Sequence, residues 1–440
     1  MVFLRIRLKF LKLTLLKPKL LKAAARLLPL LTLLMFTATS QALPLNYDTK
    51  ILKNGIKVFY KVLPQTNSVT ARIIVPTGTL NEPQKLQGIS HLIEHLIYRG
   101  NENHPTSEFR QMVIDQGGDY NGFTYIDRTE YYLRVPSAGF APAFSLYLNL
   151  ITQPGFAEPG VTLEKKIVTI EKELRNAPGN VGRIFLDELT QTQLDSSVEA
   201  ITRDDLLAYH QKFYTPRNLA VIITGAFNTT AVFQTLSGVL NTSANQGAVL
   251  PERLFPEVTT NKVIEDDLSG EYYQVLLGFE LKKISGKDLL VAKALPLLAE
   301  LHPLGYDYLY DKPLNYDISL LNAGGRFYLI FGYADSRNDY TLEMNTWHEQ
   351  NLARYCKYLQ AKNFDQSLKS LAKNMETLYK IYATDPEYLN LFYDQILFDP
   401  TAITSAELKA FSKLKPVDFK NFVIKYLQNK NYQKVIVKAK

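Results

Sequence analysis

Two segments of this chain, 213 residues apart, repeat one another. Asp205–Phe227 aligns without gaps on Asp418–Lys440, so that Lys212 falls on Lys425. In both segments a helical pattern is followed by an apolar strand pattern. Because a helix and a sheet each bury one apolar face against the other, two such copies predict two domains of the same construction.

The patterns around these segments follow the same order in the two halves. Alternating residues around Asn54-Gly55 predict a β-hairpin at the start of the first half. The next patterns predict a strand at 69–75, a helix at 82–98, a hairpin at 120–135, helices at 139–152, 159–176 and 203–213, and a strand at 219–224. The second half contains a strand at 272–279, a helix at 287–301 and a hairpin around Gly324-Gly325, followed by further helices. This order predicts an α+β fold with two homologous domains, each a mainly antiparallel β-sheet covered by helices.

Composition along the chain suggests where these parts begin and end. We expect a signal peptide at 1–42, a first domain at 43–245, a linker at 246–262 and a second domain at 263–440. The linker assignment rests on the poorly patterned stretch 228–262, which carries Asn, Thr, Ser, Gly and Pro.

The first 42 residues carry eight basic side chains and no acidic one. An uncharged apolar run at 27–36 and the sequence Ser40-Gln41-Ala42 follow, which is typical of a secretory signal peptide cleaved after Ala42. We therefore expect a periplasmic or secreted protein. The alternatives are an uncleaved signal that anchors the chain to a membrane, and a presequence that directs it to the mitochondrial matrix. The apolar run is too short for a stable membrane span, which needs about 20 residues.

The rest of the chain is almost neutral. Outside residues 1–42, 42 basic residues face 43 acidic ones. This balance does not indicate a general nucleic-acid-binding surface on the body of the protein, and we expect no nucleic-acid partner.

The residues with the strongest chemical signal are His91-Leu92-Ile93-Glu94-His95. On a helix, positions i, i+3 and i+4 share one face, so His91, Glu94 and His95 project together. Two imidazoles one turn apart can bind a single Zn²⁺ ion, and the carboxylate between them then lies beside the open position of the metal. The apolar neighbours predict that this helix is buried, where unpaired histidines and a glutamate would be costly. The pattern therefore predicts a catalytic zinc site.

A catalytic zinc site usually has three protein ligands. Two glutamates on the predicted helix at 159–176 are candidates for the third ligand. Glu164 and Glu171 are seven residues apart and share a face with the apolar Ile167 and Val168. The spacing alone does not choose between them.

The His-x-x-Glu-His order is the inverted zinc motif, and the chain resembles the insulinase/pitrilysin/mitochondrial processing peptidase family of metallopeptidases. Gly78, Glu82 and Gly88 before the motif and Gly100 after it stand where that family has them. The segments Asn121-Gly-Phe-Thr124 and Thr129-Glu-Tyr-Tyr132 are similar to the family's strand that lines the substrate cleft. The resemblance covers essentially all of the chain after residue 42, and the chain resembles the half-size, bacterial-type members.

The resemblance implies a role for each candidate residue. Glu171, which is 76 residues after His95, would be the third zinc ligand, and Glu164 would support the site by orienting a ligand. Glu94 would be the general base of a zinc endopeptidase that acts on peptides or unfolded segments. Asn121 and Thr124 would bind substrate, although a turn role for Asn121 before Gly122 is the alternative.

The resemblance also implies a partner. Full-length relatives bind substrate with an Arg and a Tyr seven residues apart in a later domain; here Tyr316 matches the Tyr, but Leu309 stands in place of the Arg. The second domain also lacks a metal motif. We therefore expect a dimer, either a heterodimer with a homologous metal-free subunit or a homodimer. The alternative functions are a non-catalytic binding or assembly subunit and a mitochondrial processing peptidase subunit.

Overall fold

The structure is a computed structural model that describes most of the chain from Tyr47 onward. The described residues are 47–175, 198–239, 261–266, 273–301, 306–307, 312–313, 315–323, 325–335, 364–427 and 432–439. The predicted signal peptide and most of the predicted linker lie outside these ranges. None of the helices in the described ranges is both long enough and apolar enough to cross a bilayer.

The first half of the chain forms a six-stranded sheet with the order β1-β2-β6-β3-β5-β4. Its strands are β1 (Asp48–Ile51), β2 (Lys57–Val62), β3 (Ser68–Val75), β4 (Asp119–Thr124), β5 (Thr129–Pro136) and β6 (Ala220–Gly225). All neighbours are antiparallel except β2 and β6. The hairpin predicted around Asn54-Gly55 joins β1 to β2, and the hairpin predicted at 120–135 joins β4 to β5. β4 is an edge strand, so one side of its backbone has no neighbouring strand in the sheet.

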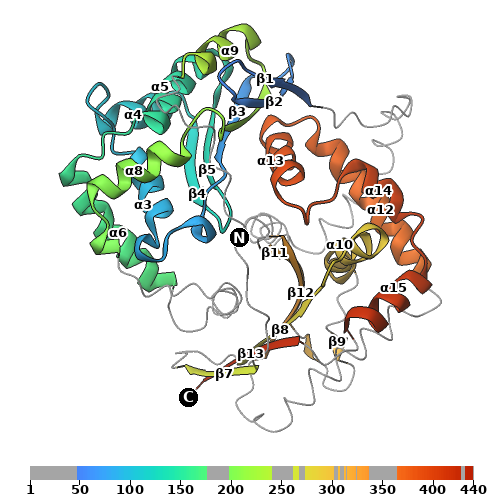
Figure 1. The fold of residues 1–440 in the computed structure, drawn as a ribbon. Coiled ribbons are helices and arrows are strands. Elements are labelled where there is room, and N and C mark those ends of the chain that lie inside the picture. The colour runs from blue at the N-terminus through green and yellow to red at the C-terminus, as the bar shows by residue number, and fades with distance from the viewer. Residues whose placement is uncertain are drawn as a thin grey trace, which may run out of the picture. The chain divides into compact units, whose positions relative to one another are not determined.

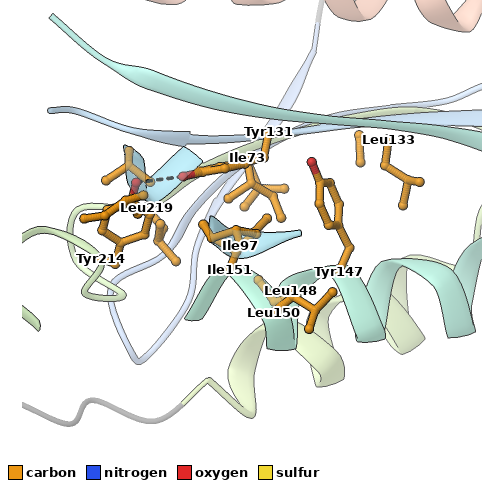
Figure 2. Packing of buried hydrophobic residues seen from close by; sticks show 14 of the residues in the cluster. Ile73, Ile97, Tyr131, Leu133, Tyr147, Leu148, Leu150, Ile151, Tyr214 and Leu219 are labelled. Carbon is orange, nitrogen blue, oxygen red and sulfur yellow. Dashed lines mark hydrogen bonds between the residues drawn. The ribbon is translucent and has the colours of Figure 1, made fainter. Parts of the chain in front are cut away.

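Helices cover one face of this sheet. They are α3 (Ile89–Ile97), α4 (Thr106–Asp115), α5 (Phe140–Thr152), α6 (Glu158–Arg175), α8 (Arg203–Phe213) and α9 (Thr229–Ser237). Figure 2 shows Ile73 and Tyr131 of the sheet facing Ile97 and Ile151 of the helices, all of them buried. The hydroxyl groups of Tyr131 and Tyr214 are 2.7 Å apart (Figure 2), so the polar ends of these buried rings satisfy one another.

The opposite face of the sheet is covered by α13 (Pro386–Phe398) from the second half of the chain (Figure 1). Asn390 of this helix is fully buried. Its amide nitrogen donates to the carbonyl oxygens of Thr70 on β3 and Ile222 on β6, and its Oδ1 accepts from Arg72. Because both faces are covered, the central strands β3 and β6 are almost entirely buried.

The predicted helix at 82–98 is wrong in its first half, because α3 begins only at Ile89. Two short 3₁₀ turns, Thr79–Asn81 and Gln84–Leu86, precede it. Gly88 has φ +92°, a left-handed conformation that ends any helix arriving from the N-terminal side. A proline such as Pro83 suits the first turn of a helix, but here the glycine sets the true start.

The second half forms a five-stranded sheet with the order β11-β12-β8-β13-β7. Its strands are β7 (Asn261–Asp266), β8 (Tyr273–Glu280), β11 (Asn315–Ala323), β12 (Arg326–Asp335) and β13 (Tyr432–Ala439), and a two-stranded pair, β9 (Tyr306–Asp307) and β10 (Lys312–Pro313), lies apart from it. Its helices are α10 (Gly286–Leu301), α12 (Phe364–Tyr382), α14 (Ser405–Phe411) and α15 (Pro416–Phe422). The hairpin predicted around Gly324-Gly325 joins β11 to β12.

The repeated segments occupy equivalent places in the two sheets. In the first segment α8 leads into β6, which is parallel to β2 and antiparallel to β3. In the second, α15 leads into β13, which is parallel to β7 and antiparallel to β8. The strand pairing therefore repeats along with the residues, and the α+β fold class is confirmed.

Candidate metal centre

The helix α3 is held between the sheet and other helices by its apolar side chains. The buried residues on it are Ile89, Leu92, Ile93, Leu96 and Ile97, each 0% exposed. Helical periodicity then places His91, Glu94 and His95 together on the remaining face. Packing of the apolar face thus fixes where these three polar side chains point.

The N-terminus of α3 is held by a buried carboxylate. Glu82 Oε2 accepts from the backbone nitrogen of Gly88 at 2.7 Å, and its Oε1 accepts from that of Ser90 at 2.9 Å. The Ser90 hydroxyl also lies 2.9 Å from the Tyr209 hydroxyl on α8. These contacts satisfy amide groups that a helix start leaves without partners, and they explain physically why a glutamate stands six residues before Gly88.

Three side chains converge at the centre of the site. His91 Nε2 and His95 Nε2 are 3.2 Å apart, and Glu171 Oε2 lies 3.5 Å from the first and 3.7 Å from the second. Ligand atoms at about 2.0–2.1 Å from a tetrahedral zinc ion are about 3.3–3.4 Å from one another. The three atoms form a triangle of that size, and among the described residues they are the group of this kind able to hold a metal ion. The residues therefore fit a single zinc ion.

The structure distinguishes the two glutamates that the spacing left open. Both lie on α6, where Val161, Glu164 and Val168 form its buried stripe against α3. Glu171 is the next position along that stripe and reaches the two Nε2 atoms. Glu164 stands two turns earlier, and its Oε2 is 2.7 Å from His95 Nδ1, on the other side of the ring. Glu164 is therefore placed to orient His95, and Glu171 to share a metal ion with it.

A second partner of Glu164 was not expected from the sequence. Arg99 donates from Nε and Nη2 to Glu164 Oε1, whereas Glu164 Oε2 faces His95. Burial raises the pKa of the Glu164 carboxyl, but the hydrogen bonds with His95 and Arg99 outweigh it, and the pKa is lowered overall. A basic residue four positions after His95 was the signal in the sequence that could have found this contact.

The charges around His95 raise the pKa of its imidazole. Burial of the imidazole lowers its pKa, but the hydrogen bond with Glu164 and the nearby carboxylates of Glu94 and Glu171 raise it, and the net direction is upward. Three carboxylates therefore surround two imidazoles, a negative surplus that suits a divalent cation.

Glu94 is held by the edge strand β4. The Thr124 hydroxyl donates to Glu94 Oε2 at 2.6 Å. Gly122 allows this approach, because a Cβ at that position would lie 2.6 Å from Glu94 Cγ. Thr124, which we expected to bind substrate, thus has its hydroxyl on the candidate general base.

Asn121 and Tyr316 were also predicted to bind substrate, and among the described side-chain contacts of Asn121 none reaches the metal cluster. Asn121 lies within β4 and not in a turn; its Oδ1 accepts from the neighbouring amide of Gly122 at 3.0 Å, and its exposed side chain lies on the sheet face opposite to Thr124. Tyr316 lies in β11, opposite Tyr333 of β12, but its side chain is outside the described part of the chain.

Two family profiles match the sequence. The profile described as insulinase (peptidase family M16) matches residues 57–202, and the profile described as the peptidase M16 inactive domain matches residues 200–321. Zinc protease PqqE of Helicobacter pylori is 23% identical over 274 residues, which cover 57% of this chain and 60% of that protein. An uncharacterized zinc protease of Rickettsia bellii is 26% identical over 192 residues, 41% of this chain and 46% of that protein. The chain therefore spans about half the length of the curated relatives it matches.

Solved structures share the fold. A protease from Helicobacter pylori superposes with a TM-score of 0.79 at 19% identity, covering 89% of this chain and 99% of that chain. The periplasmic protease PqqL from Escherichia coli superposes with a TM-score of 0.71 at 17% identity, covering 90% of this chain and 48% of that chain. At these identities the likeness concerns the fold.

Proposed function

This chain belongs to the insulinase family of peptidases, family M16, and on that basis we propose that it is a zinc-dependent endopeptidase. The observation that carries the proposal is the triangle of His91 Nε2, His95 Nε2 and Glu171 Oε2 with Glu94 on the same helix face. Relatives described as zinc proteases support the choice of metal and reaction class.

His91, His95 and Glu171 would hold the zinc ion, which when bound polarises the scissile carbonyl and lowers the pKa of water. Glu94 would take the proton of the attacking water and deliver it to the leaving amine, as a general base and then a general acid. The Thr124 hydroxyl holds one of its two carboxylate oxygens, so that the carboxylate keeps one orientation during both transfers. Glu164 would keep His95 turned with Nε2 toward the metal.

The substrate would be an extended peptide segment. β4 is the edge of the first sheet and packs directly against α3. A peptide that pairs with this edge would run past the candidate zinc ligands, and its binding would depend on main-chain hydrogen bonds more than on its sequence. Asn121, exposed on this strand, would then be available to the substrate backbone.

The test combines metal analysis with a Glu94→Gln variant. We expect about one zinc ion per chain in both proteins, and hydrolysis of an unstructured fluorogenic peptide that falls about 10²–10⁴-fold in the variant. The exposed Glu102→Gln is the matched control and should keep full activity. Zinc binding without hydrolysis in the wild-type protein would instead favour a non-catalytic binding or assembly subunit. Hydrolysis that survives Glu94→Gln would overturn the mechanism.

We further propose that the enzyme works in the periplasm as one subunit of a dimer. The basic and apolar residues of 1–42 support export, and the relative PqqL is described as periplasmic. Leu309 in place of an arginine supports a partner that completes the substrate site. An N-terminus at Leu43 in protein from the native host is expected. If the purified chain is monomeric and fully active alone, both forms of the proposal are refuted: the homodimer and the heterodimer with a metal-free homologue.

A further inference from the structure

Arg99 makes a contact with the candidate metal centre that the zinc motif does not include. It follows the C-terminus of α3, where its backbone nitrogen donates to the carbonyl of Leu96 at 3.0 Å and its carbonyl accepts from the Thr106 hydroxyl at 2.7 Å. Its side chain runs along α6, since a Cβ at Gly160 would lie 3.5 Å from Arg99 Cβ and Cγ. The backbone and the side-chain stem are therefore both held before the guanidinium reaches Glu164.

The Glu164 carboxylate is divided between two groups. Its Oε1 accepts from both Nε and Nη2 of Arg99, and its Oε2 lies 2.7 Å from His95 Nδ1. The Glu164 side chain is only 4% exposed, whereas that of Arg99 is 33% exposed. A buried carboxylate is costly unless a cation and hydrogen bonds compensate it. The partly exposed Arg99 supplies the cation and two of the hydrogen-bond donors.

This arrangement determines which nitrogen of His95 faces the cluster. An ionised Glu164 can only accept hydrogen bonds, so His95 Nδ1 must carry a proton and donate it to Oε2. The Nε2 atom, 3.2 Å from His91 Nε2, then presents its lone pair toward the other two candidate ligands. Without a second partner on Oε1, the Glu164 carboxylate could rotate about its stem and lose the His95 contact.

We propose that Arg99 is a positioning residue for the metal centre, which acts through Glu164 to hold His95 in the orientation and tautomer that bind zinc. The inference rests on the proposed zinc function and adds to it a residue outside the His-x-x-Glu-His motif. A lysine should replace Arg99 only in part, because its ammonium group keeps the charge but does not reproduce the planar pair of donors on one oxygen.

The test measures zinc affinity without substrate. Metal-free protein is titrated with zinc against a chromogenic chelator for the wild type, Arg99→Met, Arg99→Lys and the control Arg110→Met, which removes an exposed arginine on α4. We expect Arg99→Met to weaken zinc binding about 10- to 100-fold, the range for removing an outer partner of a ligand. The zinc affinity of Arg99→Lys should lie between those of the wild type and Arg99→Met, and the zinc affinity of Arg110→Met should match that of the wild type. With cobalt in place of zinc, the visible absorption bands should shift in Arg99→Met and stay unchanged in Arg110→Met.

A double-mutant cycle with Glu164→Gln tests the route of the effect. If Arg99 acts through Glu164, Arg99→Met should change zinc affinity by less than about threefold in the Glu164→Gln background. Additive losses, or an Arg99→Met protein with wild-type affinity, would overturn the inference. Circular dichroism of the metal-free proteins checks folding, and Arg99→Gln, with the same expectation, replaces any Arg99→Met protein that does not fold. Because no substrate is used, a zinc-binding chain that hydrolyses nothing would refute the peptidase and leave this result standing.

Discussion

Thr124 donates a hydrogen bond of 2.6 Å to Glu94 Oε2, and this bond joins the edge strand β4 to the helix α3. Strand β4, which we propose pairs with a peptide substrate, thus also orients the Glu94 carboxylate that would transfer the proton of the attacking water. A displacement of β4 would move the candidate general base with it. If a peptide pairs with β4 as proposed, this contact would make substrate pairing and the position of Glu94 interdependent.

Replacing Thr124 with Val should slow hydrolysis while leaving zinc in place. The variant keeps the β-branched shape of the side chain but removes the donor to Glu94 Oε2, so the carboxylate loses its fixed orientation. We expect kcat to fall roughly tenfold, in line with about 1–1.5 kcal/mol for a hydrogen bond to a charged group. Thr124→Ser, which keeps the hydroxyl, is the control and should retain most of kcat. Equal rates in the Val and Ser variants would show that the bond does not contribute.

Gly122→Ala should damage the same group by steric contact. A Cβ at this position would lie 2.6 Å from Glu94 Cγ and 2.8 Å from its Oε1, so either Glu94 or β4 must shift. We expect a stability loss of about 1–3 kcal/mol in chemical denaturation, together with a lower kcat. Gly117→Ala is not a matched control because Gly117 has φ +67°, so Asp119→Ala, at an exposed position of the same strand, serves instead. Unchanged stability and activity in Gly122→Ala would contradict the prediction, because β4 or Glu94 could then shift without loss of stability or activity.

Glu82→Gln should weaken the start of α3. The carboxylate accepts from two backbone amides, and an amide side chain can accept only with its single oxygen. Leaving one buried N–H without a partner costs about 1–3 kcal/mol, which urea denaturation of the metal-free protein would measure. The exposed Glu102→Gln should show no such loss. A Glu82→Gln protein as stable as the wild type would show that Gly88 alone sets the helix start.

His210 should make the protein less stable in mild acid. Its ring is buried and 2.8 Å from the Ile151 carbonyl oxygen, and burial lowers the pKa of His210 from 6.5 to about 4. The unfolded chain therefore binds a proton between these values and the folded chain does not. The stabilisation is fully present above pH 6.5 and is lost as the pH falls toward 4.

Between pH 7 and pH 5 this linkage should remove about 2 kcal/mol from the free energy of unfolding. Urea denaturation at the two pH values measures it, and His210→Gln, which does not titrate, should lose that part of the pH dependence. A wild-type protein with equal stability at both pH values would contradict the prediction.

Local periodicity was sufficient for much of this protein. The common face of His91, Glu94 and His95, most helices and strands of the first half, and the repeat of α8–β6 in α15–β13 follow from local sequence patterns, whereas α4 and α9 were not predicted. Helical and strand geometry convert such short spacings directly into directions in space. The start of α3 was missed by this reasoning, because the positive φ of Gly88 prevents the helix from extending back to Glu82.

Residue spacing alone did not choose between Glu164 and Glu171; the family resemblance implied Glu171, and the tertiary structure supplies the physical reason. Both glutamates lie on one face of α6, and only the packing of α6 against α3 decides which carboxylate meets the Nε2 atoms and which meets Nδ1 of His95. The contacts of Arg99 with Glu164 and of Thr124 with Glu94 join side chains 65 and 30 residues apart. Distances of this kind depend on how whole elements pack, and the spacing of residues along a single helix or strand carries no information about them.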